Sequence, residues 1–171
     1  MRNKFMPFLS GALASMLIAT SCSPKMNSLS DTNMLYNHPD APTENAGPVD
    51  VSTTVLKHFY QEYGEMADAK WSASANGFMV CFRNNNMLNT IYYRRNGAVE
   101  ATIHAYEAAQ LATPVRRQVQ SLFPNYEIGH VDEVQKNGVT AFYVTVQDAS
   151  TIKKIKLVDG EWEPVESMIK R

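Results

Sequence analysis

Turn signals recur in this chain at a fixed spacing, and this recurrence constrains the fold more than any other feature. Asn76-Gly77 is followed about 60 residues later by Asn137-Gly138, and Asn96-Gly97 by Asp159-Gly160. The apolar positions that suggest helices repeat at the same offset, with Val55, Phe59 and Tyr63 matching Val115, Val119 and Phe123. A fixed period of this kind indicates a duplicated structural unit.

Each unit is predicted to begin with a helix. The first helix follows Ser52, a plausible N-cap, and ends at Gly64. The second has Thr113 as its predicted cap and Pro114 at its first helical position. The apolar stripe of the first helix comprises Val55, Leu56, Phe59 and Tyr63, and that of the second Val115, Val119 and Leu122.

After each helix the apolar residues recur at every second position, which is typical of antiparallel strands with one face on a core. Asn-Gly and Asp-Gly pairs between such stretches favour tight hairpins, because a type I′ turn needs two residues of positive φ. The predicted fold is therefore α+β, with two tandem helix-plus-four-strand units that form one curved antiparallel sheet and both helices on one face. The alternating stretches include Phe78–Phe82, Ile91–Arg94, Val99–His104, Phe142–Val146 and Lys154–Leu157.

The N-terminal residues are predicted to be a secretory signal that spans residues 1–21. Arg2 and Lys4 precede a short apolar stretch, and small residues lead to Cys22. That stretch is shorter than the roughly 20 residues that a membrane-spanning helix needs. A Cys directly after the small residues is similar to the lipid attachment site of bacterial lipoproteins, which makes Cys22 the candidate for acylation. Cleavage after Ser21 by an ordinary signal peptidase is the alternative, and it would release a soluble periplasmic protein.

Residues 22–50 are predicted to be a flexible tether, because this proline-containing polar stretch lacks the apolar surface that a core requires. One domain is predicted over residues 51–171, with repeats at about 51–108 and 109–171. Without Arg2 and Lys4, 14 basic and 17 acidic residues remain, which leaves a net charge of −3 with neutral histidines. This mildly acidic balance argues against a nucleic-acid partner.

Several of these segments together resemble the PepSY-like domains of bacterial secreted proteins. They are Lys70-Trp71, Asn76–Phe82, Arg95–Gly97, Thr113–Val115, Phe123–Tyr126 and Asp159-Gly160. The resemblance implies a fold similar to that of the β-lactamase inhibitor protein and a binding or inhibitory module without catalytic residues. Two departures weaken the inhibitor analogy: Thr113 stands where the family often has Leu, and an acylated Cys22 leaves Cys81 without a disulfide partner in the chain.

Catalytic chemistry has little support in the sequence. The four histidines lack the spacing of a helical metal site, and neither a nucleophile elbow nor a glycine-rich phosphate loop is present. Cys81 lies between large apolar residues, where a packed thiol is more common than a nucleophile. Glu161 and Glu163 flank Trp162, a pattern typical of charges that discourage pairing at a sheet edge. No metal, cofactor or enzymatic activity is therefore predicted.

The sheet face opposite the helices is the predicted binding surface, although an ordinary solvated face would show the same alternation. Tyr and Arg are enriched at interaction hot spots. We therefore expect an envelope lipoprotein of the outer membrane, facing the periplasm or the cell surface, that binds a protein such as a peptidase or cell-wall enzyme and inhibits or regulates it. The alternatives are a glycan- or small-molecule-binding module and, more remotely, a hydrolase. The residues predicted on this face are Tyr92, Arg94, His104, Tyr143, Lys154 and Lys156, with Met79 and Cys81 beside them.

Overall fold

The computed structural model describes residues 49–171. The predicted signal peptide, the predicted lipid site Cys22 and nearly all of the predicted tether lie outside these residues. The described elements, in chain order, are α2 (Thr53–Tyr63), β1 (Lys70–Ser74), β2 (Gly77–Asn84), β3 (Met87–Arg94), β4 (Val99–Glu107), the short 3₁₀ helix η1 (Ala108–Gln110), α3 (Thr113–Leu122), β5 (Glu127–Lys136), β6 (Val139–Gln147), β7 (Thr151–Val158) and β8 (Glu161–Ile169).

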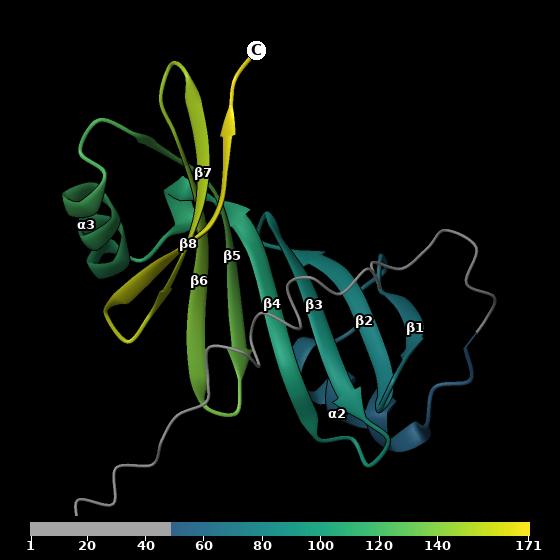
Figure 1. The fold of residues 1–171 in the computed structure, drawn as a ribbon. Helices are drawn as coiled ribbons and strands as arrows, with labels where there is room; N and C mark the ends of the chain where they lie inside the picture. Colours follow the sequence, from purple (N-terminus) through teal and green to yellow (C-terminus); the bar gives the residue numbers. More distant parts are fainter. Residues whose placement is uncertain (1–48) are drawn as a thin grey trace, which may run out of the picture.

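The eight strands form one antiparallel sheet in which each strand pairs with the next along the chain, from β1 to β8. A helix followed by four strands occurs twice, so the predicted α+β fold of two such units is confirmed. Figure 1 shows the sheet twisting along its length, with α2 behind β2 and β3 and α3 beside the strands of the second unit. The hydrophobic clusters described below place both helices on the same side of this sheet.

The local signals for the helices are largely confirmed. The Ser52 hydroxyl accepts a hydrogen bond of 3.4 Å from the backbone N–H of Val55, as an N-cap does, and Gly64 ends α2 with a φ of 71°. The prediction for the start of α3 is wrong by one residue. Ala112 occupies the N-cap position without a side-chain hydrogen bond, and Thr113 is already helical. Pro114 still lies in the first turn, where its missing N–H costs no intrahelical bond.

The hairpin turns differ in how well the sequence predicted them. Asn137-Gly138 and Asp159-Gly160 have positive φ at both positions, as a type I′ turn requires. At Asn96-Gly97 only Gly97 has positive φ, and the loop is longer than the predicted two residues. Gly77 belongs to β2 rather than to a turn, and a Cβ atom there would lie 2.2 Å from the backbone oxygen of Tyr93. Close approach of two strands therefore explains this glycine.

Each helix packs on its own hydrophobic cluster. Phe59 of α2 is fully buried against Val80 and Phe82 of β2. Val119 of α3 is fully buried against the second unit, in a cluster with Val144 of β6 and Ile155 of β7. A cross-strand row joins the two clusters, and because neighbours in such a row share one sheet face, both helices cover the same side. The row consists of Phe82, Asn89, His104, Glu133, Phe142 and Leu157.

Tyr93 provides a test of the first cluster by its pH dependence. It is 1% exposed, and burial raises its pKa from 10.0 to about 12, with Tyr63 and Glu62 adding to the effect. Because the folded-state pKa lies above the unfolded value, the stability contribution of the neutral phenol is complete below pH 10 and is lost between pH 10 and 12. Urea unfolding at pH 9 and pH 11 is expected to show that Tyr93→Phe loses about 1 kcal/mol less over this interval than the wild type. Equal losses in both proteins would mean that Tyr93 ionises freely in the folded state.

Candidate functional site

The candidate site is the sheet face that bears neither helix, which we call the helix-free face. Its residues follow from the strand register, since directly opposed residues lie on one face. Three cross-strand rows form its centre. The first row is Ser72, Met79, Tyr92, Ala101, Lys136 and Val139. The apolar row is Cys81, Thr90, Ile103, Val134, Ala141 and Val158. The charged row is Leu88, Ala105, Asp132, Tyr143, Lys156 and Glu163.

The apolar row makes this face unusual for a sheet that already carries helices on its other side. Val134 and Ala141 have no exposed surface, and Val158 is 7% exposed. They belong with Tyr143 to a hydrophobic cluster built from strand residues alone. The thiol of Cys81 contacts the Thr90 hydroxyl at 3.2 Å, and burial raises the thiol pKa. A protonated, partly buried thiol supports the prediction of a packed cysteine over a nucleophile.

Charged side chains surround Tyr143 in the charged row. The Lys156 ammonium lies 5.7 Å from the centre of the Tyr143 ring and 3.4 Å from a carboxylate oxygen of Glu163. The ammonium group of Lys154 lies 3.2 Å from Asp132, whose other carboxylate oxygen lies 3.0 Å from His130. These contacts form a network of both charge signs beside the apolar row.

Burial governs the ionisation of this network more than its ion pairs do. It raises the pKa of Asp132, with His130 acting in the opposite direction, and it lowers the pKa of Lys154, opposed by Glu166. Each shift disfavours the charged form of its group. A partner that displaces water from this region would therefore find charges that are already partly desolvated.

Five of the six residues predicted for the site lie on the helix-free face. Tyr92 is in the first row, Tyr143 and Lys156 are in the charged row, and Lys154 lies on the same face opposite Thr145. Tyr143 and Lys156 are 0% and 1% exposed, although the period-two pattern had suggested a solvated face. Their role in binding stays a prediction.

The other two predicted residues lie on opposite faces of the sheet. Arg94 lies on the helix-free face, two residues after Tyr92, and is exposed at the end of β3 opposite Gly77. The placement of His104 on this face is wrong, because the register puts it in the row beneath the helices. There its Nδ1 lies 2.7 Å from the Asn89 side-chain oxygen. The alternation in β4 was assigned to the wrong faces because its apolar residues Ala101 and Ile103 lie on the helix-free face.

Sequence reasoning missed Asp132 and Leu88. No strand was predicted over residues 127–136, so Asp132 could not be placed beside Tyr143 and Lys156. Leu88 is 37% exposed in the same row. It lies four residues before Tyr92 on β3, and the period of two puts both side chains on one face. The four-residue spacing between Leu88 and Tyr92 was therefore the sequence signal that could have placed Leu88 at the site.

A second polar group lies on the helix side of the sheet. The Tyr106 hydroxyl donates a hydrogen bond of 2.8 Å to Glu133, and Gln135 donates one of 2.9 Å to the other oxygen of that carboxylate. Burial and the Glu133 carboxylate raise the pKa of Tyr106 far above its ordinary value. A phenol held neutral in this way keeps its proton at neutral pH and serves as a hydrogen-bond donor.

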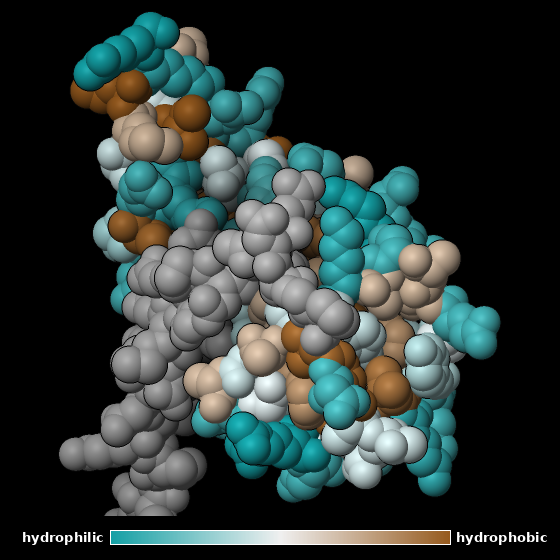
Figure 2. All heavy atoms as spheres, turned by 90° about the vertical axis from the view of Figure 1, so that its right-hand side faces the viewer, coloured by the Kyte–Doolittle hydropathy of each residue, from teal (hydrophilic) through white to brown (hydrophobic). Residues whose placement is uncertain are grey.

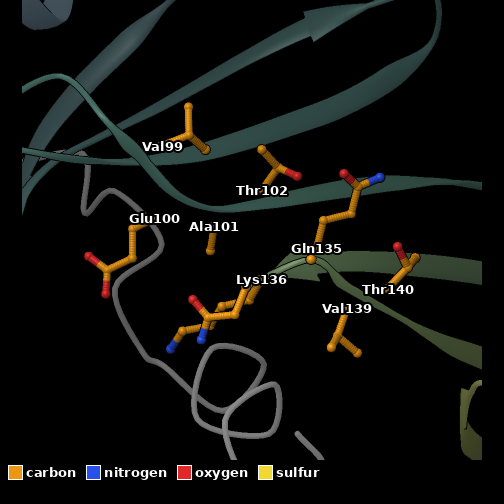
Figure 3. A pocket seen from close by; sticks show the side chains of 10 residues that line it. Val99, Glu100, Ala101, Thr102, Gln135, Lys136, Val139 and Thr140 are labelled. Atoms are coloured by element: carbon orange, nitrogen blue, oxygen red, sulfur yellow. The ribbon is translucent and has the colours of Figure 1, made fainter. Parts of the chain in front are cut away.

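A cavity of about 270 Å³ lies where the start of β4 meets the β5–β6 hairpin (Figure 3). Its lining comes from both faces of the sheet, with Thr102 and Gln135 from one row and Ala101 and Lys136 from another. The Thr102 hydroxyl is buried without a hydrogen-bond partner. The lining contains both polar and apolar residues, and Glu100 and Lys136 are its ionisable side chains.

Within residues 49–171, no cluster of three or more His, Cys, Asp or Glu side chains is arranged to hold a metal ion. In the same part of the chain, no helix has the length and apolar character needed to cross a membrane. Figure 2 views the molecule from the right-hand side of Figure 1, where β1 lies, and shows some apolar residues there among largely hydrophilic ones.

Comparison with solved structures identifies proteins of the same fold. A DUF2874 family protein from Bacteroides ovatus superposes with a TM-score of 0.55 at 14% identity, over 72% of this chain and 89% of that one. A BLIP-like protein from Bacteroides fragilis gives a TM-score of 0.54 at 16% identity, over 72% of this chain and 89% of that one. A protein from Bacteroides eggerthii, provisionally described as periplasmic, gives 0.53 at 14% identity, over 70% of this chain and 88% of that one. No family model matches the sequence, and no curated protein matches it.

Proposed function

We propose that this chain is a non-catalytic envelope protein that binds a protein partner through its helix-free face and inhibits or regulates an envelope enzyme such as a peptidase. The observation that carries this proposal is the apolar row lying beside a charged row on a face that bears neither helix. Protein interfaces combine an apolar centre with a polar periphery in this way. The predicted contact residues that lie on this face are Tyr92, Arg94, Tyr143, Lys154 and Lys156.

The structural comparisons support the proposal at the level of fold. One similar structure is BLIP-like and another is provisionally described as periplasmic, which fits an exported binding module. The resemblance of the sequence to PepSY-like domains points the same way. We infer a single PepSY-like domain over residues 51–171 that follows a signal over 1–21 and a tether over 22–50.

Cys22 is proposed as the lipid anchor of this domain, which would hold the protein on the outer membrane. Two or more acyl chains bind a bilayer firmly, whereas one gives only marginal binding. In cells grown with a labelled fatty acid, the wild-type protein is expected to carry the label and to sediment with membranes, and Cys22→Ser is expected to do neither. Label on both proteins, or on neither, would contradict acylation at Cys22.

The proposed function is tested by crosslinking inside the cell. A photoreactive amino acid at position 88, on the helix-free face, is expected to capture a partner that mass spectrometry identifies as an envelope protein. The matched control carries the same amino acid at position 61, which is exposed on the outer side of α2. Capture of the same proteins from both positions would contradict specific binding through the helix-free face.

A glycan- or small-molecule-binding function is the second candidate, and the cavity beside the β5–β6 hairpin favours it. The unpartnered Thr102 hydroxyl within that lining is a group that a ligand could satisfy. If this function is correct, Thr102→Val weakens ligand binding and leaves partner capture from position 88 unchanged.

A further inference from the structure

Strand β8 forms an edge of the sheet, and almost all of its side chains are exposed. It pairs with β7 on one side, and among residues 49–171 no strand pairs with its other side. This one strand carries half of the large apolar side chains that are exposed in the described chain, namely Trp162, Val165, Met168 and Ile169. An open, apolar strand edge is a template for pairing with another chain.

The hydrogen bonds to β7 show which residues of β8 direct their backbone groups to the open side. The N–H of Lys170 donates to the Ser150 oxygen, so Lys170 points toward β7. Backbone direction alternates along an antiparallel strand. The backbone N–H and C=O of Ser167 and Ile169 therefore point outward.

A bulge at Val165 changes this alternation. Glu166 pairs with Lys154 and Pro164 with Ile155, which leaves Val165 without a partner in β7. The extra residue shifts the alternation by one position, so the backbone groups of Pro164 and Trp162 also point outward. Pro164 thus places its missing N–H on the open side, where the pairing with β7 loses no hydrogen bond.

We propose that β8 is a dimerisation strand, which pairs antiparallel with β8 of a second copy of the chain around a two-fold axis centred at Val165 and Glu166. In this register Trp162 faces Ile169 of the other copy, and Pro164 faces Ser167. The outward groups of these four residues form about six hydrogen bonds between the chains, because each proline lacks one donor. The contact is isologous and closed, as in most soluble homodimers.

The bulge is what makes this register possible. Trp162 lies opposite Leu157 and Ile169 lies opposite Thr151 in β7, so both side chains are on the helix side of the sheet. Without the extra residue they would lie on opposite faces and could not oppose each other across a two-fold axis. Trp162 is already held in place, because its ring centre lies 5.2 Å from that of Phe123. Ile169 is 82% exposed, so this pair buries apolar surface in both copies.

Charge complementarity favours a second copy over an unrelated strand. The first half of β8 contains Glu161 and Glu163, and Lys170 and Arg171 follow its end. The proposed register places Glu161 opposite Lys170 of the other copy, in a non-hydrogen-bonded pair where side chains are closest. Lys170 donates one hydrogen bond of 2.7 Å to the Asp148 backbone oxygen, and its ammonium keeps two further donors for the carboxylate.

Dimerisation in this way leaves the helix-free face open and duplicates it. A two-fold axis perpendicular to the sheet keeps both helix-free faces on the same side, so the dimer presents two binding surfaces in one direction. The inference concerns β8 alone, and its failure leaves the proposed partner binding untouched.

Sedimentation equilibrium of the full chain after signal removal, with Cys22→Ser, tests the proposal. A monomer–dimer equilibrium is expected, and Ile169→Asp is expected to raise the dimer Kd at least about thirtyfold. The control Tyr60→Asp changes a side chain on α2 that is 50% exposed and is expected to dimerise like the parent protein. A parent protein that stays monomeric up to about 1 mM, or an Ile169→Asp variant that dimerises equally well, would overturn the proposal. Growth beyond the dimer would do the same, because it would show β8 pairing with the other sheet edge, β1.

A charge exchange tests the register. Glu161→Lys and Lys170→Glu are each expected to raise the dimer Kd about tenfold, because like charges then face each other twice in the symmetric contact. Combining the two changes restores opposite charges and is expected to return the Kd to near the parent value. A double variant as weak as either single variant would contradict the pairing of Glu161 with Lys170.

Discussion

Replacing Phe59 by alanine is expected to lower the free energy of unfolding by about 3–5 kcal/mol. Phe59 has no exposed surface, and its ring centre lies 5.2 Å from that of Trp71 and 5.3 Å from that of Phe82. Truncation removes this contact area and leaves a cavity that the sheet beneath cannot close. Since domains of this size are stable by only about 5–15 kcal/mol, the loss is a large part of the total. Chemical denaturation measures it directly.

Tyr60→Ala is the matched control for this change. Tyr60 is the next residue of the same helix and is 50% exposed, so its removal is expected to change the unfolding free energy by less than about 1 kcal/mol. Similar losses in the two variants would contradict the packing of α2 through Phe59. In that case, contacts other than the apolar stripe of α2 would hold this helix on the sheet.

The overall fold could be predicted because its signals are local. Ser52 and Gly64 mark the ends of α2 by hydrogen bonding and backbone conformation, and Asp159-Gly160 specifies a tight turn without help from distant residues. The offset of about 60 residues between equivalent turns then supplied the duplication. The helix ends and tight turns depend on only a few neighbouring residues, so a single sequence is enough to reveal them.

The site could be predicted only in part, because the face of a strand depends on its neighbours. In β4, both sets of alternating residues contain apolar members, and only the pairing of His104 with Asn89 and Glu133 shows which set lies beneath the helices. Gly77 shows the same limitation. Its role depends on the backbone of Tyr93, which is distant in sequence. Tyr143 was placed on the correct face, but its burial depends on the clustering of residues from several strands.

The double variant Leu88→Ala/Tyr92→Ala is expected to lose affinity for the captured partner by at least about thirtyfold. Both side chains lie on the helix-free face of β3 and flank Thr90 of the apolar row. Truncation of large residues at the centre of an interface costs about 2 kcal/mol or more, which corresponds to roughly thirtyfold in Kd. Tyr143 is excluded from the variant because it is fully buried, and its loss would lower stability as well as binding.

The central claim is that the helix-free face is the binding surface, and one titration tests it most directly. The Kd of the partner captured from position 88 is measured for the wild type, for Leu88→Ala/Tyr92→Ala and for Tyr60→Ala/Leu122→Ala. The last variant removes the same two residue types from the helices, where Tyr60 is 50% and Leu122 is 37% exposed. With all three proteins folded, our account predicts a Kd at least about thirty times higher for the sheet variant and an unchanged Kd for the helix variant. A sheet variant that binds like the wild type, or a helix variant that loses affinity to the same extent, would contradict it.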